Sequence, residues 1–187
     1  MSRSPDIHVC PPWFAWVINN PLRRWLHNPE DILGRLVAPG FTVVELGCGS
    51  GPFTIALAQM VGPAGRVIAA DLQPAMLAKV QRRVAQAGLR DRVEFHLCGR
   101  EHVGLSIHVD FVLAFWMVHE VPNTPTLFAE MNEALNPDGK LLLVEPKLHV
   151  GRRGFEKEVA AAVEARLNLI ARPSVRLSHA ALFAKES

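Results

Sequence analysis

The sequence predicts a doubly wound α/β domain, in which helices cover both faces of a mostly parallel, seven-stranded sheet. Three observations support this fold class. Short apolar runs rich in β-branched residues alternate with segments whose apolar residues recur every three or four positions. The run at 109–115 is almost continuously apolar, as expected for a strand covered on both faces. The runs at 167–171 and 180–184 lie too close together for a helical crossover, so they should form a hairpin with one antiparallel terminal strand.

The individual elements follow from these runs and from the residues that end them. We expect strands at 41–46, 66–70, 93–97, 109–115, 140–144, 167–171 and 180–184. We expect helices at 53–61, 74–87, 124–135 and 155–166, so that strand and helix alternate throughout the parallel part. Pro74 suits a first helical turn, and Gly88 suits a helix end. The Asn-Pro-Asp-Gly segment at 136–139 is typical of a turn before the next strand.

Length and composition fit one globular domain. The chain has 187 residues, of which 49% are hydrophobic and 20% charged, and its formal net charge is +2. A chain of this size buries roughly 70% of its unfolded surface, so its core needs no disulfide or metal. A collagen, a disordered tail and a disulfide scaffold are excluded. We expect a single domain over 1–187, with a helical cap segment at 1–40, where Pro and Trp are frequent, and the α/β core at 41–187.

Charge and cysteine content predict a cytoplasmic protein without a nucleic-acid or membrane partner. The three cysteines lie far apart and follow no signal-type segment, which fits a reducing compartment. The apolar run at 13–18 is too short to span a membrane. The arginine doublets at 23–24, 82–83 and 152–153 are interpreted as solvated helix faces rather than as a nucleic-acid patch. The oligomeric state stays open, with a homodimer as one option.

Candidate ligand-binding residues follow the first two strands, where open α/β sheets bind ligands. Gly47, Gly49 and Gly51 let the backbone turn tightly and approach a ligand closely, and an ordinary turn would need only one glycine. Asp71 ends the second strand and is placed to accept both hydroxyls of a ribose. The alternative for Asp71 is that it caps the next helix.

Glu45 discriminates between ligands that contain adenosine. A dinucleotide fingerprint needs a small residue at position 52, where this chain has Pro52. A carboxylate beside the glycine turn repels a pyrophosphate, whereas it suits a ligand that carries an ammonium and a sulfonium group. The pattern therefore favours a sulfonium cofactor over a dinucleotide.

These residues resemble the motifs of the class I S-adenosylmethionine-dependent methyltransferases. The matching segments are 43–54 (VVELGCGSGPFT), 70–72, 110–115 and 135–139. The stretch at 117–122 is similar to the branch that includes the ubiquinone and menaquinone biosynthesis methyltransferases. The resemblance implies a Rossmann-like fold, S-adenosylmethionine as cofactor and S-adenosylhomocysteine as product.

The resemblance also implies which residues bind the cofactor. The three glycines would hold the methionine part and the ribose, Glu45 would assist the amino group, and Leu72 would lie against the adenine. Many relatives carry an acid after the third strand, where this chain has Cys98-Gly99-Arg100, so Glu101 or a backbone carbonyl would replace it. The full expected set is Glu45, Gly47, Cys48, Gly49, Gly51, Asp71, Leu72, Gly99, Arg100 and Phe115.

Candidate catalytic residues follow the fourth strand, where the methyl group and its acceptor should meet. His119 titrates near neutral pH and, with Glu120 beside it, could remove a proton from the acceptor. The alternative is that both residues cap or pack the following helix. No metal is expected, because no second histidine stands at ligand spacing. The acceptor is expected beside aromatic and Met side chains that could equally be packing residues, namely Trp13, Trp16, Trp116 and Met117.

The predicted function is therefore the transfer of a methyl group to a small organic acceptor. One alternative is a non-catalytic domain that binds S-adenosylmethionine and acts through a partner. Another is a nucleic-acid or protein methyltransferase. Amino-methylating nucleic-acid relatives often carry Asn or Asp, Pro-Pro and an aromatic residue after the fourth strand, but here that place holds Phe115-Trp116-Met117, which disfavours the nucleic-acid alternative.

Overall fold

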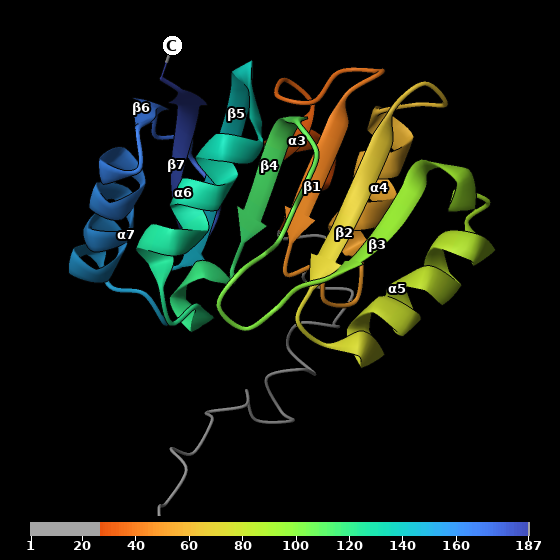
Figure 1. The fold of residues 1–187 in the computed structure, drawn as a ribbon, viewed down its shortest axis with the longest axis horizontal. Helices are drawn as coiled ribbons and strands as arrows, with labels where there is room; N and C mark the ends of the chain where they lie inside the picture. The colour runs from red at the N-terminus through yellow and green to blue at the C-terminus, as the bar shows by residue number, and fades with distance from the viewer. Residues whose placement is uncertain (1–26, 187) are drawn as a thin grey trace, which may run out of the picture.

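The computed structural model describes residues 27–186, and within them seven strands form a single sheet (Figure 1). The strands are β1 (Thr42–Leu46), β2 (Arg66–Asp71), β3 (Val93–Leu97), β4 (Val109–Phe115), β5 (Leu135–Pro146), β6 (Leu167–Ala171) and β7 (Ser178–Lys185). Their order across the sheet is β3-β2-β1-β4-β5-β7-β6. β7 runs antiparallel to both β5 and β6, while the first five strands are parallel. The predicted fold class, including the terminal hairpin, is confirmed.

Helices cover both faces of this sheet. They are α3 (Pro29–Leu33), α4 (Pro52–Met60), α5 (Pro74–Gln86), α6 (Thr124–Ala134) and α7 (Arg152–Glu164), with single 3-10 turns η1 (Arg90–Arg92) and η2 (Val118–Glu120). A proline stands at the start of α3, α4, α5 and α6, where its missing N–H has no partner to lose. Asn28 caps α3 by accepting a hydrogen bond from the Glu30 backbone. The cap predicted at 1–40 lies mostly outside the described residues.

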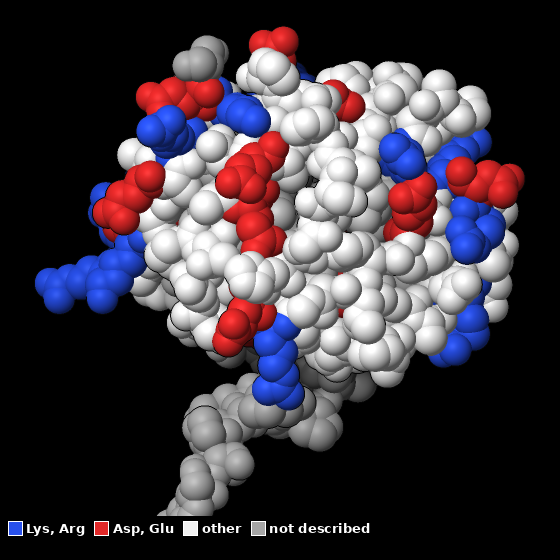
Figure 2. All heavy atoms as spheres, in the orientation of Figure 1, with Lys and Arg blue, Asp and Glu red and all other residues white. Residues whose placement is uncertain are grey.

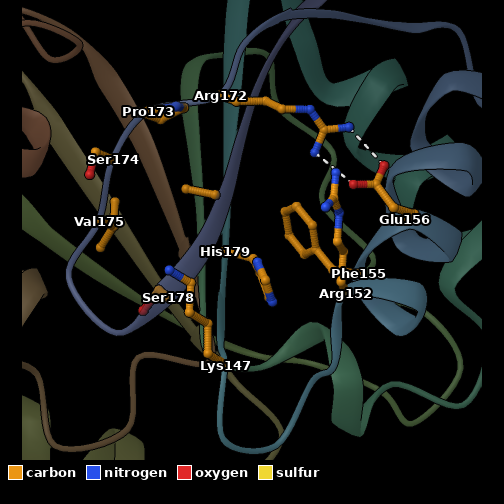
Figure 3. A pocket seen from close by; sticks show the side chains of 11 residues that line it. Lys147, Arg152, Phe155, Glu156, Arg172, Pro173, Ser174, Val175, Ser178 and His179 are labelled. Atoms are coloured by element: carbon orange, nitrogen blue, oxygen red, sulfur yellow. Dashed lines mark hydrogen bonds and ion pairs between the residues drawn. The ribbon is translucent and has the colours of Figure 1, made fainter.

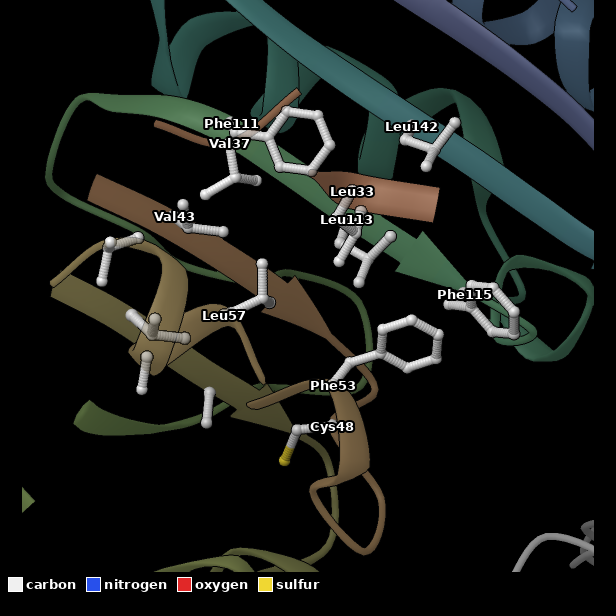
Figure 4. Close-up of a cluster of buried hydrophobic side chains, with 14 of the residues drawn as sticks. Leu33, Val37, Val43, Cys48, Phe53, Leu57, Phe111, Leu113, Phe115 and Leu142 are labelled. Atoms are coloured by element: carbon white, nitrogen blue, oxygen red, sulfur yellow. The ribbon is translucent and has the colours of Figure 1, made fainter. Parts of the chain in front are cut away.

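Two apolar layers hold the helices on the sheet. Side chains alternate along each strand, so Val43 faces α3, α4 and α5, while Val44 faces α6 and α7. Figure 4 shows the first layer, to which Leu57 of α4, Leu33 of α3 and Phe111 of β4 contribute. All three are fully buried, and burying one such side chain contributes about 1.5–3 kcal/mol. The layers fix where each strand ends.

The expected alternation of strand and helix fails between β3 and β4. Residues 98–108 connect these strands without a helix. The segment is short for a crossover and contains Gly99 and Gly104, of which Gly104 has a φ of +71°. Glu130 of α6 holds it by accepting hydrogen bonds from the backbone N–H groups of Val103 and Gly104, at 2.7 and 3.1 Å. Side-chain anchoring thus replaces a helix here.

The turn predicted at 136–139 lies inside β5 instead of before it. Val109 pairs with Leu135, and Phe111 pairs with Lys140, so these four residues bulge out opposite Asp110. The Asn136 side chain closes the bulge by donating to Asp110 at 2.7 Å. The turn chemistry was recognised correctly, but a bulge satisfies it without ending the strand.

The carboxyl ends of β1, β2, β4 and β5 meet at one edge of the sheet (Figure 1). Because β7 is antiparallel, it begins at this same edge, where Ser178 pairs with Pro146. The residues that follow β1, β2, β4 and β5 are thereby gathered together with the first residues of β7.

Candidate functional site

The glycine turn after β1 depends on left-handed backbone conformations. The φ angles of Gly47, Gly49 and Gly51 are +65°, +52° and +81°. A Cβ on Gly47 would lie 2.9 Å from the Cβ of Met117, so the turn passes too close to the segment after β4 for any side chain. Gly47 itself is exposed, whereas Cys48 is buried. The turn therefore presents backbone to solvent at the carboxyl edge.

Asp71 fastens this turn to the end of β2. Its Oδ2 accepts a hydrogen bond from the Gly49 backbone N–H at 3.0 Å and lies 3.8 Å from the Cys48 Sγ. Its Oδ1 accepts from the Gln73 backbone N–H at 2.9 Å. The N-cap of α5 is Gln73, so Asp71 is not the helix cap that the sequence left open. Oδ1, which accepts only one of these hydrogen bonds, has a further lone pair with which to accept a ligand hydroxyl.

Two helices clamp the turn from its other sides. The Thr54 hydroxyl of α4 donates a short hydrogen bond to Oε2 of Glu45, whose side chain is buried. Arg83 of α5 donates to the carbonyl of Ser50 at 2.5 Å. Arg83 is exposed, as expected for a solvated helix face, and it makes this contact from there. Neither contact follows from the motif alone, because each joins residues on different elements.

The two cysteines near the turn are poor nucleophiles. Burial, together with the carboxylates of Glu45 and Asp71, raises the pKa of the Cys48 thiol far above its usual range. Burial and Asp71 also raise the pKa of Cys98 to about 11. Both thiols therefore stay protonated at neutral pH, as expected for packing residues.

An aromatic group closes the end of β4. The Phe115 ring lies 4.5 Å from Phe53 and 5.6 Å from Trp116, measured between ring centroids. Trp116 has a φ of +60°, which is uncommon for a residue with a bulky side chain, and its indole Nε1 donates to the Ser178 hydroxyl at 3.0 Å. The His27 ring contacts both Phe115 and Trp116 edge-on. This group excludes water from one side of the carboxyl edge.

A histidine–carboxylate pair follows β4 and β5. His119 donates from Nδ1 to Oε2 of Glu145 at 2.5 Å, and the Val118 backbone N–H donates to Oε1 at 2.8 Å. Glu145 is fully buried, and both of its oxygens accept hydrogen bonds. Nε2 of His119 lies 4.0 Å from Glu120, and the His119 side chain is 22% exposed. The nitrogen not bound to Glu145 therefore faces Glu120, and the His149 ring stacks on the imidazole with 6.2 Å between centroids.

Charges around the pair control its protonation. Burial lowers the pKa of His119, but the hydrogen bond and the charge of Glu145 outweigh it, and the net effect is a pKa above the usual 6.5. Glu158 of α7 lies nearby, and burial and Glu145 raise its pKa to about 7. Oε2 of Glu158 is buried and has no hydrogen-bond partner in the described part of the chain. The positive charge of His119 also lowers the pKa of Glu158, but burial and Glu145 outweigh it.

The structure places the remaining predicted residues as follows. Leu72 is 51% exposed just after β2, in a position to cover a flat ligand. Gly99 and Arg100 are exposed at the start of the 98–108 connection. Phe115 is buried in the aromatic group, and Met117 is half-buried against the glycine turn. Trp13 and Trp16 lie outside the described residues.

Glu145 is the main site residue that the sequence reasoning missed. A signal was present, because an acid that ends the apolar run at 141–144 occupies the same kind of position as Glu45 in β1. The pairing of Glu145 with His119 could not be predicted from the sequence, because it depends on how β4 and β5 align in the sheet.

Among residues 27–186, no three His, Cys, Asp or Glu side chains are grouped in a way that could hold a metal ion. None of the helices in that range combines the length and the apolar character needed to cross a membrane. Figure 2 shows that basic and acidic side chains are interspersed on the face drawn.

Comparison with known proteins identifies relatives. A family model described as a methyltransferase domain matches residues 43–139. The chain is 33% identical over 117 residues to an arsenite methyltransferase from Halobacterium salinarum, which covers 62% of this chain and 29% of that protein. It is 30% identical over 110 residues to a demethylmenaquinone methyltransferase from Lactobacillus johnsonii, which covers 58% and 45% of the two chains. The chain thus spans less than half the length of these two relatives.

Solved structures share the whole fold. An S-adenosylmethionine-dependent methyltransferase from Aquifex aeolicus aligns with a TM-score of 0.81 at 23% identity, over 94% of this chain and 98% of the other. One structure from Clostridium thermocellum, named a putative rRNA methylase, shares the fold with a TM-score of 0.64 at 21% identity, over 86% of this chain and 94% of the other. At this level of identity the likeness concerns the fold and leaves the acceptor open.

Proposed function

The chain belongs to the methyltransferase domain family, of the class I S-adenosylmethionine-dependent type, and on this basis we propose that it methylates a small organic acceptor. One juxtaposition carries the proposal. The glycine turn and Asp71 lie at the ends of β1 and β2, and the His119–Glu145 pair lies at the ends of β4 and β5. Residues that would bind the cofactor and residues that would accept a proton therefore lie along the same edge of the sheet.

The residues present fit the cofactor. The space that a side chain on Gly47 would need is taken by Met117, so the exposed backbone of the turn is kept free of side chains. Asp71 would accept the ribose hydroxyls while keeping its hydrogen bonds to the turn. Glu45 supplies the negative charge that suits the ammonium and the sulfonium. Leu72 would cover the adenine, with Gly99 and Arg100 beside it.

Positioning is the main contribution that this chain can make. When bound, S-adenosylmethionine supplies a methyl group made electrophilic by its sulfonium, and S-adenosylhomocysteine is the product. Met117 lies against the turn and Trp116 lies against Ser178, and both would hold the acceptor in line. The aromatic group of Phe53, Phe115 and Trp116 would keep water from the reacting atoms.

His119 would act where the acceptor must lose a proton. Its Nδ1 is engaged with Glu145, so Nε2 would take the proton from the acceptor. The imidazolium that forms would be stabilised by the Glu145 carboxylate, which is the same interaction that raises the His119 pKa. Glu120 stands 4.0 Å from Nε2 and would draw the proton onward to solvent. An acceptor that is already deprotonated would not need this step.

The names of the relatives support a small acceptor. One relative is named for arsenite and the other for demethylmenaquinone, and neither name refers to a nucleic acid or a protein. We therefore place the acceptor among small molecules that bind between the glycine turn and Trp116. A homodimer and a cytoplasmic location remain parts of the proposal.

Titration calorimetry of the full chain tests the function. S-adenosylmethionine and S-adenosylhomocysteine should bind in the micromolar range, while NAD and NADP, run in parallel, should not. Formation of S-adenosylhomocysteine is then followed with pools of small phenols and acids, with RNA and with a protein mixture. Binding of a dinucleotide would refute the cofactor assignment. Turnover with RNA or protein alone would refute the small acceptor, and binding without any turnover would favour a domain that acts through a partner.

A further inference from the structure

A pocket lies beside the carboxyl edge, away from the glycine turn. Its volume is about 600 Å³, and it is formed by the first turn of α7, the β6–β7 connection and the start of β7 (Figure 3). Phe155, Val175 and Ala180 give it an apolar floor. The His179 ring stacks on Phe155 with 5.2 Å between ring centroids. This floor suits a flat or aliphatic body.

The rim of this pocket is basic. Lys147, Arg152 and Arg172 stand around it against a single carboxylate, Glu156. Arg172 binds Glu156 through two hydrogen bonds, of 3.1 and 2.7 Å. In the described part of the chain, neither Lys147 nor Arg152 has an ion-pair partner. In Figure 3 the Arg152 side chain points to the side of the pocket where Arg172 and Glu156 lie. The rim therefore carries three cationic side chains against one carboxylate.

The pocket is one strand away from the His119–Glu145 pair. His179 is the residue opposite Glu145 across β5 and β7, and opposed side chains in such pairs have Cβ atoms about 4.5–5.5 Å apart. Ser178, which also lines the pocket, accepts the hydrogen bond from the Trp116 indole. A molecule seated in the pocket would thus extend toward the place where the acceptor is methylated.

We propose that this pocket binds the anionic group, a carboxylate or a phosphate, of the methyl acceptor. The inference rests on the proposed function and specifies the acceptor as a small organic acid. Arg152 and Lys147 bind the anion, and Arg172 is held in place by Glu156 at its side. The apolar body lies on Phe155 and Val175, and its far end reaches toward His119. Neutral analogues lack the group that these cations recognise.

Calorimetry with two anionic probes tests the pocket on protein saturated with S-adenosylhomocysteine. Benzoate and phenyl phosphate represent the two anion sources, and benzyl alcohol is the neutral counterpart. At least one anion should bind, and benzyl alcohol should not. Arg152→Gln and Lys147→Gln should each weaken that binding about tenfold, which is typical of losing one charged hydrogen bond. Salt at about 1 M, where the Debye length is about 3 Å, should weaken it as well.

Arg66→Gln is the matched control for Arg172→Gln. Both arginines are 46% exposed in their side chains and pair with a glutamate, but Arg66 pairs with Glu94 at the far end of β2. Of these two variants, Arg172→Gln should weaken anion binding and Arg66→Gln should not. All four variants should keep their affinity for S-adenosylhomocysteine.

Two results distinguish this inference from the function beneath it. Normal S-adenosylhomocysteine binding together with no anion binding, or with equal anion binding by Arg152→Gln and the wild type, would overturn the pocket and leave the methyltransferase standing. Displacement of both small acids by a short RNA oligonucleotide would also overturn it, in favour of a nucleic-acid acceptor. Failure to bind S-adenosylhomocysteine would remove the proposed function and this inference with it.

Discussion

His119 and Glu145 are joined by a hydrogen bond of 2.5 Å between Nδ1 and Oε2, although 26 residues separate them in the sequence. The bond fixes which nitrogen of His119 is engaged and directs the other one outward. Because Glu145 also accepts from the Val118 backbone, its position is set by β5 and by η2 together. The histidine is therefore oriented by the fold itself, before any acceptor binds.

Replacing Glu145 by Gln should move the pH dependence of turnover. The carboxylate raises the His119 pKa, and burial, which lowers it, would remain. His119 in Glu145→Gln should therefore lose its proton at lower pH, and the acidic limb of the kcat/KM profile should shift to lower pH. Glu120→Gln, which removes a weaker and more exposed charge, should shift it less. An unchanged profile in Glu145→Gln would mean that His119 does not act as the base.

His119→Ala should lower turnover roughly 10²–10⁴-fold for an acceptor that must lose a proton, which is the usual contribution of a general base. Affinity for S-adenosylmethionine should stay within a factor of two to three, about the error of such comparisons, because His119 makes no contact with the glycine turn in the structure. His102→Ala, on the 98–108 connection, serves as the control and should leave turnover unchanged. Equal turnover in the His119 variant and the wild type would make His119 a packing residue.

Asp71→Asn should weaken cofactor binding about 10–100-fold, which corresponds to one lost charged hydrogen bond of about 1.5–3 kcal/mol. Asn keeps the size of the side chain and can still accept from Gly49 or Gln73, so the fold should survive. Calorimetry with S-adenosylhomocysteine measures the change, and the melting temperature monitors folding. Asp138→Asn, in the β5 bulge on the opposite edge, should bind normally. Wild-type affinity in Asp71→Asn would contradict the assigned ribose contact.

Gly47→Ala and Gly62→Ala separate backbone strain from crowding. Both glycines have a φ near +65°, at +65° and +67°, so each variant should lose about 1–2 kcal/mol to a left-handed alanine. Only Gly47→Ala also places a Cβ 2.9 Å from Met117, while Gly62 has nothing within 4 Å. Gly47→Ala should therefore be the less stable variant in urea and the one that loses cofactor affinity. Equal losses of stability, with binding intact in both, would show that the turn tolerates a side chain.

The fold was predictable wherever burial on both faces leaves a continuous apolar run. The strands at 93–97, 109–115 and 167–171 were placed to the residue for this reason, or because Gly and polar residues bound them. The connection at 98–108 was not predictable, because its backbone is held by Glu130, which lies on a different element, α6. The same holds for the site. The glycine turn is local and was predicted, whereas Glu145 and the basic pocket combine separate segments that only the register of β5 and β7 brings together.

Glu158 should make the protein less stable as the pH rises. Its pKa is about 7 in the folded chain and near 4.5 in the unfolded one, because burial and Glu145 disfavour its charge. The folded state therefore holds the proton more tightly between these values, and stability is present below about pH 4.5 and lost as the pH rises through 7. Glu158→Gln, which cannot ionise, should gain about 3 kcal/mol relative to the wild type at pH 8 and should flatten this slope. The pKa of His119 is also raised in the folded chain, so the stability that His119 contributes is likewise lost as the pH rises above 6.5. Some dependence of stability on pH should therefore persist in Glu158→Gln.

Urea unfolding at several pH values measures both effects. Glu164→Gln, exposed on the same helix, is the control that should keep the full pH dependence. A Glu158→Gln protein with the same slope as the wild type would place the titrating group elsewhere.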